Sequence, residues 1–200
     1  MNIIFATNNQ NKVAEIRAAV PAIFNIIPLQ EAGIDIDIPE PHPTLHENAR
    51  EKAITIYNLT GTSCFSEDTG LEVTALNGEP GVKSARYAGE DRAFDKNIEK
   101  LLANLQGKED RSAQFRTVIC LVLQGTEHYF EGICKGTIIK EQKGSEGFGY
   151  DPVFVPEGAE ATFAEMTLHQ KNRYSHRRKA VDKLVAFLNG LPHNSLNKEY

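Results

Sequence analysis

Short apolar runs and helical spacings alternate along the first part of the chain. Apolar runs rich in β-forming residues cover residues 2–7 and 24–29, and both are expected to be strands. Between them, apolar residues recur at helical spacing over residues 12–20 until Pro21 stops the pattern. This strand–helix–strand order favours an α/β fold.

Three further helices are expected from capping residues and apolar spacing. Residues 31–43 alternate acidic residues with isoleucine and then carry prolines, which predicts an exposed loop. The residues that follow fit a capping box, which opens a helix over residues 44–59. An amphipathic pattern predicts a long helix at 91–105, and the last helix is expected at 175–190.

The remaining apolar runs predict strands separated by turn-forming residues. Residues 64–66 form a short strand that leads into an acidic segment, and the chain continues extended over 71–76. Two longer runs, 113–123 and 128–139, predict an antiparallel hairpin, and 153–155 is a short strand. No repeat or linker interrupts the pattern, which therefore predicts one mixed α/β domain.

The composition is that of an ordinary globular protein with an acidic surplus. The 200 residues are 40% hydrophobic and 24% charged, which excludes disordered, collagen-like and low-complexity proteins. We expect a single domain over residues 1–191 and a polar tail at 192–200. The net charge of −5 favours a small-molecule partner, because nucleic-acid backbones are bound by a surplus of Lys and Arg.

The sequence gives no sign of export, membrane insertion or disulfide bonding. Its 3 cysteines are an odd number without C-x-x-C spacing, which favours buried, inert thiols. The N-terminus has no basic leader, and the longest strongly apolar run, 118–123, is far shorter than the ~20 residues that span a membrane. We therefore expect a soluble, cytoplasmic protein without a membrane partner.

The first candidate site lies where the first strand meets the first helix. Unpaired amides at a helix start favour anionic ligands, and the helix dipole adds to this preference. A hydroxyl, side-chain amides and an ammonium group suited to phosphate come from Thr7, Asn8, Asn9, Gln10, Asn11 and Lys12. An ordinary Asn-rich turn with a solvated lysine is the alternative, and the glycines of a P-loop are missing.

The second candidate site is a pair of adjacent acids at the end of a predicted strand. Glu67 and Asp68 precede Thr69 and a turn glycine, and a bend there can turn both carboxylates toward one cation. Mg²⁺ in proteins prefers one or two carboxylates together with substrate phosphates and water. Glu40 and Glu47 could add charge, although Glu47 also fits the capping box. An Asx-type turn is the alternative for the paired acids.

Two later segments add aromatic and basic groups. The first segment is glycine-rich and includes residues 148–151. Its glycines allow the backbone to approach a ligand closely, its aromatic rings can stack on a base, and its aspartate can accept a hydrogen bond. A hairpin turn with core aromatics is the alternative. The second, 171–179, concentrates positive charge at a helix start, where an anion would stabilise it, and a solvated face is the alternative. The candidates are Phe148, Gly149, Tyr150 and Asp151 in the first segment and Lys171, His176 and Arg177 in the second.

Together these segments describe a magnesium–nucleotide site, and their motifs resemble those of a known family. The chain resembles the inosine/xanthosine triphosphate pyrophosphatases, which hydrolyse deaminated purine nucleotides. The motifs occur in the same order as in the family and span nearly the whole length of the chain. Its motifs are Thr7-x-Asn9-x-x-Lys12, Glu47-Asn48-Ala49 with Lys52, Glu67-Asp68-Thr69-Gly70, Pro80-Gly81-Val82-x-Ser84-Ala85-Arg86-Tyr87, Phe148-Gly149-Tyr150-Asp151 and Ser175-His176-Arg177.

The resemblance implies Mg²⁺-dependent hydrolysis of ITP, dITP and XTP to the monophosphate and pyrophosphate. It implies Asp68 as proton acceptor and metal ligand, and Glu40 as a further ligand. It also implies an elongated α/β fold, with a mixed sheet and flanking helices in two lobes, an active site in the cleft, and a homodimer. The nucleotide would be held by Thr7 to Lys12, Thr69, Phe148 to Asp151, Lys171, His176 and Arg177.

Two positions depart from the family's pattern, and other functions fit some of the residues. Glu67 stands where the family more often has Asp, and Pro41-His42-Pro43 replaces a glycine-containing turn beside Glu40. The alternatives are a pyrophosphatase for other modified nucleotides, a nucleotide sensor without turnover, and an RNA-binding module at 171–183. The acidic residues argue against the sensor, and the net charge argues against RNA binding.

Overall fold

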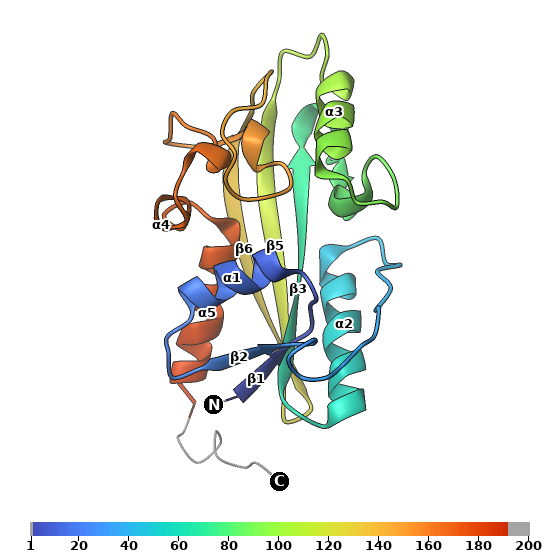
Figure 1. Ribbon diagram of the computed structural model, residues 1–200, viewed down its shortest axis with the longest axis vertical. Helices are drawn as coiled ribbons and strands as arrows, with labels where there is room; N and C mark the ends of the chain where they lie inside the picture. Colours follow the sequence, from blue (N-terminus) through green and yellow to red (C-terminus); the bar gives the residue numbers. More distant parts are fainter. Residues whose placement is uncertain (1, 192–200) are drawn as a thin grey trace. The chain divides into compact units, whose positions relative to one another are not determined.

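The computed structural model describes residues 2–191, which form a mixed α/β protein (Figure 1). The strands are β1 (Asn2–Phe5), β2 (Asn25–Pro28), β3 (Cys64–Val73), β4 (Pro80–Gly81), β5 (Ser112–Leu123), β6 (Thr126–Ile138) and β7 (Phe154–Pro156). The helices are α1 (Gln10–Ala19), α2 (Leu45–Thr60), α3 (Phe94–Asn104), α4 (Leu168–Lys171) and α5 (His176–Asn189). The predicted α/β class is confirmed, and the predicted tail at 192–200 lies outside the described residues. No helix within the described residues is long and apolar enough to cross a membrane.

The strands form one mixed sheet in the order β2-β1-β3-β5-β6-β7, with β4 paired to β3. β1 runs parallel to both neighbours, with Ile3 opposite Ile26 of β2 and Phe5 opposite Phe65 of β3. β4 and β7 pair antiparallel with β3 and β6. The parallel pair β1 and β2 is connected through α1, which is the strand–helix–strand unit that the sequence predicted.

β5 and β6 are joined by a tight two-residue turn. Both connecting residues have positive φ angles, 51° at Gln124 and 79° at Gly125. Positive φ at both central residues is typical of the hairpin turns whose twist matches that of the flanking strands. The predicted hairpin is therefore confirmed.

The chain divides into two compact units. Among the described residues, the first comprises 2–68, Val118–Gly132 and 177–191. The second comprises Thr69–Thr117 and Ile133–His176. Three of the four unit boundaries fall within β3, β5 and β6, so each of these strands contributes one part to each unit, and the fourth follows His176, the first residue of α5.

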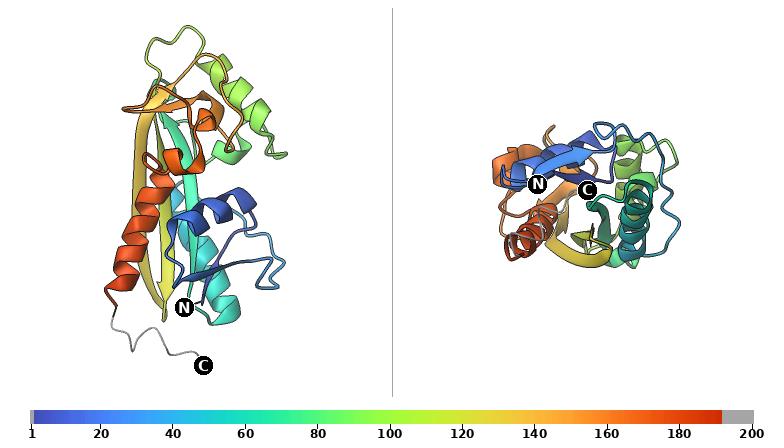
Figure 2. Two further views of the ribbon diagram at one scale, coloured as in Figure 1. Left: turned by 60° about the vertical axis from the view of Figure 1, so that its left-hand side comes forward. Right: turned by 90° about the horizontal axis from the view of Figure 1, so that it is seen from below.

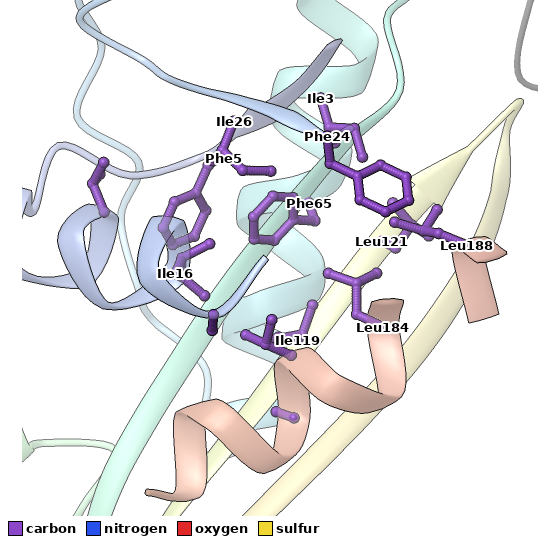
Figure 3. Packing of buried hydrophobic residues seen from close by; sticks show 14 of the residues in the cluster. Ile3, Phe5, Ile16, Phe24, Ile26, Phe65, Ile119, Leu121, Leu184 and Leu188 are labelled. Carbon is purple, nitrogen blue, oxygen red and sulfur yellow. The ribbon is translucent and has the colours of Figure 1, made fainter. Parts of the chain in front are cut away.

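The first unit has a hydrophobic core between its strands and two helices (Figure 3). Phe5 of β1 and Phe65 of β3 stack with their ring centroids 4.5 Å apart and their planes 7° from parallel. Ile16 of α1 and Leu184 of α5 are buried in the same cluster. Apolar residues at helical spacing in α1 and α5 thus close one face of the strands.

α2 covers the other face of β3, away from α1 and α5 (Figures 1 and 2). The Cys64 thiol donates a hydrogen bond to the Ala53 carbonyl of α2 at 3.2 Å. The Ser66 hydroxyl donates to the Ala49 carbonyl of the same helix. Since Cys64 and Ser66 alternate with Phe65, the side chains of β3 point in turn to α2 and to the hydrophobic core.

Both predicted ends of α2 are confirmed. Thr44 caps the helix, because its Oγ1 accepts the Glu47 N–H at 3.2 Å and donates to the Glu47 carboxylate at 2.7 Å. Gly61, with φ at 65°, ends the helix and donates its N–H to the Tyr57 carbonyl at 2.8 Å. A left-handed residue after the last turn is the usual glycine stop.

The second unit has its own core around Phe115 of β5. The Phe115 ring meets Phe154 of β7 edge-on, with centroids 4.7 Å apart. Ile98 and Leu101 of α3 and Phe163 are buried in the same cluster. The apolar residues whose spacing predicted a helix at 91–105 therefore lie on the side of α3 that faces the core.

Three element predictions were wrong. β3 continues through residues 67–70 instead of ending before them, and residues 74–76 form a short 3₁₀ turn rather than extended chain. α3 begins at Phe94 instead of residue 91, because Arg92 has a φ of 53°, which a right-handed helix cannot contain. α4 was not predicted, since four residues are too few for a helical spacing.

Candidate active site

The predicted site residues belong to both units of the chain. The first unit holds Thr7 to Lys12, Glu40, Asp68 and Arg177. The second unit holds Thr69, Phe148 to Asp151, Lys171 and His176. One unit boundary passes between Asp68 and Thr69 and another between His176 and Arg177. The chain therefore changes units within two of the predicted site segments.

Side chains at the start of α1 bind the backbone of that helix. Asn9 is the N-cap, and its Oδ1 accepts hydrogen bonds from the N–H groups of Asn11 at 3.0 Å and Lys12 at 3.2 Å. Thr7 Oγ1 accepts the Asn9 N–H at 3.2 Å. The Asn-rich turn, which was the alternative to a phosphate-binding segment, is thus present in the structure. The exposed residues of the segment are Asn8, Gln10 and Asn11.

Lys12 belongs to a cluster of buried charges and is not a solvated lysine. Its Nζ lies 2.9 Å from Oε1 of Glu67, whose side chain is fully buried. Arg177 donates to the two Glu67 oxygens, from Nε at 2.7 Å and from Nη2 at 3.1 Å. Arg177 also donates from Nη1 to Glu15 of α1. One carboxylate of β3 is therefore held by cations from α1 and α5.

Glu67 and Arg177 stabilise each other's charged forms. Burial raises the pKa of Glu67, but the charges of Arg177 and Lys12 outweigh burial and hold that pKa far below its ordinary value. Burial lowers the pKa of Arg177, but Glu67 and Glu15 outweigh it and raise the pKa above its ordinary value. Both groups thus stay charged at neutral pH, and loss of one partner would leave a buried charge uncompensated.

A second buried cluster connects β3 to α2 and to the acidic loop. Lys52 Nζ of α2 lies 2.6 Å from Glu40 Oε1 and 3.0 Å from Asp68 Oδ1. Burial lowers the pKa of Lys52, but Asp68 and Glu40 outweigh burial and raise it. The cation therefore keeps its charge and holds Glu40 close to Asp68, despite the prolines that follow Glu40 in the sequence.

Glu67 and Asp68 point to opposite faces of β3. Glu67 meets Arg177 on the side of α1 and α5, whereas Asp68 meets Lys52 on the side of α2. β3 has no break at this point, so successive side chains alternate. The prediction that a bend turns both carboxylates toward one cation was therefore wrong. Each acid has its own buried basic partner, which allows both to remain in an uninterrupted strand.

Asp68 offers a free oxygen to a ligand. Its Oδ1 binds Lys52, whereas its Oδ2 is buried without a hydrogen-bond partner among the described residues. Burial raises the pKa of Asp68, and the charge of Lys52 partly offsets this rise. A buried oxygen without a partner fits a water molecule or a hard divalent cation.

The acids fit a cation that is completed by other ligands. Asp68 and Glu40 supply hard carboxylate oxygens, which Mg²⁺ prefers. Within residues 2–191, no group of three or more His, Cys, Asp or Glu side chains is arranged to hold a metal. A cation bound by Asp68 and Glu40 would therefore take its remaining ligands from phosphate and water.

In the second unit, Asp151 fixes Lys171 and the backbone of Phe148. Asp151 Oδ2 accepts a hydrogen bond from Lys171 Nζ at 2.6 Å and from the Phe148 N–H at 2.9 Å. Lys171 Nζ lies 5.3 Å from the centroid of the Phe148 ring and 5.2 Å from that of Phe163. The arrangement holds a buried ammonium group beside an aromatic ring.

Gly147 makes this arrangement possible. Its φ is 75°, and a Cβ atom at this position would overlap the Asp151 carboxylate. Gly149 also has a positive φ, 63°, but a Cβ there would meet no atom within 4 Å. The first glycine is thus required by a close approach and the second by backbone conformation.

The other predicted residues of the second unit have well-defined neighbours. Tyr150 is 4% exposed and donates from its hydroxyl to the Ser84 carbonyl at 2.8 Å, so the core-aromatic alternative holds for this ring. His176 stacks on Phe115 with centroids 4.6 Å apart. The hydroxyl oxygens of Thr69 and Thr117 lie 2.6 Å apart.

The basic segment at 171–179 is not a single cluster of charge. Lys171 is neutralised by Asp151, and Arg177 by Glu67 and Glu15. Arg178 is partly exposed and pairs with Asp182 one turn later. The anions expected near the start of α5 are therefore carboxylates of the protein itself. The alternative prediction, a basic helix face exposed to solvent, applies to Arg178.

Comparison with known proteins identifies the family. A model of the Ham1 family matches residues 3–187. The chain belongs to the Ham1 family. Similar relatives include a dITP/XTP pyrophosphatase of Flavobacterium psychrophilum, 49% identical over 94% of this chain and 98% of the relative. A dITP/XTP pyrophosphatase of Porphyromonas gingivalis is 50% identical over 93% of this chain and 96% of the relative.

Solved Ham1 structures share the fold. The Staphylococcus aureus Ham1 protein is similar with a TM-score of 0.86 and 40% identity, over 95% of this chain and 99% of that one. A HAM1 protein from Coxiella burnetii gives a TM-score of 0.87 and 35% identity, over 96% of this chain and 100% of that one. The Ham1 fold thus accounts for nearly the whole chain.

Two charged residues of the buried clusters had no predicted role. Glu15 is absent from the sequence motifs, and Lys52 appears in one of them without a function. Glu15 is 7% exposed and Lys52 is 7% exposed, although both are charged. A signal was present, because Lys52 lies between Asn48 and Ile56 on the buried face of its helix. A charged residue on such a face requires a buried partner of opposite charge.

Proposed function

We propose that this Ham1-family chain hydrolyses the deaminated purine nucleotides dITP, XTP and ITP to the monophosphate and pyrophosphate, with Mg²⁺. Relatives named dITP/XTP pyrophosphatases at 49% and 50% identity support a hydrolase that acts on nucleoside triphosphates. The structural observation that carries the proposal is the buried Asp68 Oδ2, which has no partner among the described residues and lies in the cluster with Lys52 and Glu40.

In this proposal the first unit acts on the phosphates and the attacking water. Asp68 and Glu40 would hold Mg²⁺, which, when bound, neutralises phosphate charge and polarises the phosphorus. The Asp68 carboxylate orients the water and accepts its proton. Lys52 fixes that carboxylate through Oδ1 and leaves Oδ2 for the reaction. Lys12 and the start of α1 bind the phosphate chain.

The second unit recognises the base in this proposal. Phe148 offers a stacking surface, and Lys171 is the nearby donor for the 6-keto oxygen of hypoxanthine or xanthine. Adenine carries an amine at this position, and a buried donor left without an acceptor costs ~1–3 kcal/mol. Guanine shares the 6-keto group, so rejection of GTP depends on the substituent at position 2.

Pyrophosphate release tests the proposal directly. Purified protein is incubated with Mg²⁺ and dITP, XTP, ITP, GTP or ATP, alongside the variant Asp68→Asn. We expect fast release from the deaminated nucleotides and a loss of at least about a hundredfold in kcat in the variant, which keeps the side-chain shape but not the base. Near-normal turnover in Asp68→Asn would remove Asp68 from this role.

Failure on all substrates would point to one of the alternatives. Tight nucleotide binding without turnover would indicate a sensor, and turnover confined to other modified nucleotides would indicate a related pyrophosphatase. A homodimer and a cleft that holds the site follow from the family resemblance alone, and a cytoplasmic location follows from the sequence pattern. All three stay predictions. Sedimentation of the purified protein tests the homodimer.

A further inference from the structure

Phe94 is a large apolar residue that lies outside the hydrophobic cluster of the second unit. It is the first residue of α3, and the residue is 41% exposed. The buried residues of α3 are Asn97, Ile98 and Leu101. Phe94 is not among the described residues that form or pack against the hydrophobic cluster of the second unit. Burial on folding therefore does not account for a phenyl ring at this position.

The ring next to Phe94 is that of Phe148. Their centroids lie 6.2 Å apart, with the planes tilted by 45°. Phe148 is half-buried and also lies outside the hydrophobic cluster. Its backbone is held by Asp151, and Lys171 Nζ lies over its ring. Two adjoining phenyl rings thus lie outside this cluster, and one of them, Phe148, lies beneath a fixed cation.

We propose that Phe94 is a specificity-determining residue that contacts the purine base bound against Phe148. The inference rests on the proposed function, because it takes Phe148 as the surface on which the base stacks. A purine has two fused rings and extends beyond one phenyl ring. The tilted ring of Phe94 adds a second apolar surface beside the first, which favours a bicyclic base over a single-ring pyrimidine.

Probes with and without a base separate this contact from the binding of phosphates. IMP carries the base, whereas inorganic tripolyphosphate carries only a phosphate chain. In Phe94→Ala we expect the KM for dITP and the inhibition constant of IMP to rise about tenfold, as expected for lost stacking. We expect the inhibition constant of tripolyphosphate and the kcat for dITP to stay unchanged.

Two control variants show whether the ring itself is responsible. Phe94→Tyr keeps an aromatic ring and is expected to retain the wild-type constants for dITP and IMP. Leu59→Ala truncates an apolar residue that is 60% exposed near the end of α2, and it is expected to change neither constant. Thermal unfolding of each variant confirms that the compared proteins are folded.

Two results would overturn the inference. The first is unchanged inhibition by IMP in Phe94→Ala. The second is equal weakening of inhibition by IMP and by tripolyphosphate, which would assign Phe94 to the support of the whole site. Absence of hydrolysis by the wild-type protein would contradict the proposed function instead. Calorimetric titration of wild type and Phe94→Ala with IMP would then still decide whether Phe94 contacts the base.

Discussion

Single residues of the candidate site are charged groups buried in pairs. Lys171 and Asp151 lie 2.6 Å apart with both side chains 4% exposed, and Glu67 and Arg177 are buried to a similar degree. Removing an ion from water costs several kcal/mol, which a well-placed partner of opposite charge offsets. Each pair therefore fixes the position of two side chains at once. Replacing one member destabilises the other, because it leaves a buried charge without that partner.

The Glu67 cluster gives a test of this coupling. Glu67→Gln keeps the side-chain shape but removes the charge that faces Arg177 and Lys12. We expect the free energy of unfolding to fall by about 3 kcal/mol, because a buried cation loses its main partner. Urea denaturation followed by circular dichroism measures the change.

An exposed ion pair supplies the matched control. Glu31 pairs with Arg17 at 2.7 Å, but its side chain is 52% exposed. Glu31→Gln is expected to leave the free energy of unfolding unchanged, because water screens such pairs. If Glu67→Gln were as stable as Glu31→Gln, the buried cluster would add no net stability.

At the scale of elements, the loop that leads to Asp151 depends on one glycine, Gly147. Gly147→Ala places a methyl group on the Asp151 carboxylate, which holds the Phe148 backbone and Lys171. We expect this variant to lose more stability than Gly149→Ala, where only the positive φ is strained, at about 1–2 kcal/mol. Urea denaturation of both variants compares the two losses, and equal losses would show that the carboxylate moves aside without cost.

Elements set by local signals could be predicted from the sequence, whereas side-chain partners could not. The ends of α2 follow from Thr44 and Gly61, which act within one helical turn of the residues they cap. The continuity of β3 through Glu67 depends on Arg177, 110 residues later in the sequence. Only the folded chain brings these two charges together, so the sequence around the acids predicts a bend where the structure has a continuous strand.

At the scale of the whole molecule, long strands connect the two units. β3, β5 and β6 each have residues in both, so unfolding of one unit interrupts strands that continue into the other. A boundary of this kind differs from a flexible linker between independent domains. The continuity of the strands therefore favours a single cooperative unfolding transition.

The cysteines can test this cooperativity, because they are buried in both units. Cys64 and Cys120 lie in the first unit and Cys134 in the second. Burial raises the pKa of Cys64 to about 12 and that of Cys120 to about 11. At pH 8 a pKa this high leaves about one thiolate in a thousand or fewer, so folded protein should react slowly with thiol reagents.

Pulsed alkylation across a urea series, followed by mass spectrometry, measures the reactivity of each cysteine separately. We expect Cys64, Cys120 and Cys134 to become reactive at the same urea concentration, since the strands that carry them belong to one transition. Circular dichroism should give the same midpoint. If Cys134 reacted at a lower urea concentration than the other two, the second unit would open on its own, and the shared strands would not couple the units.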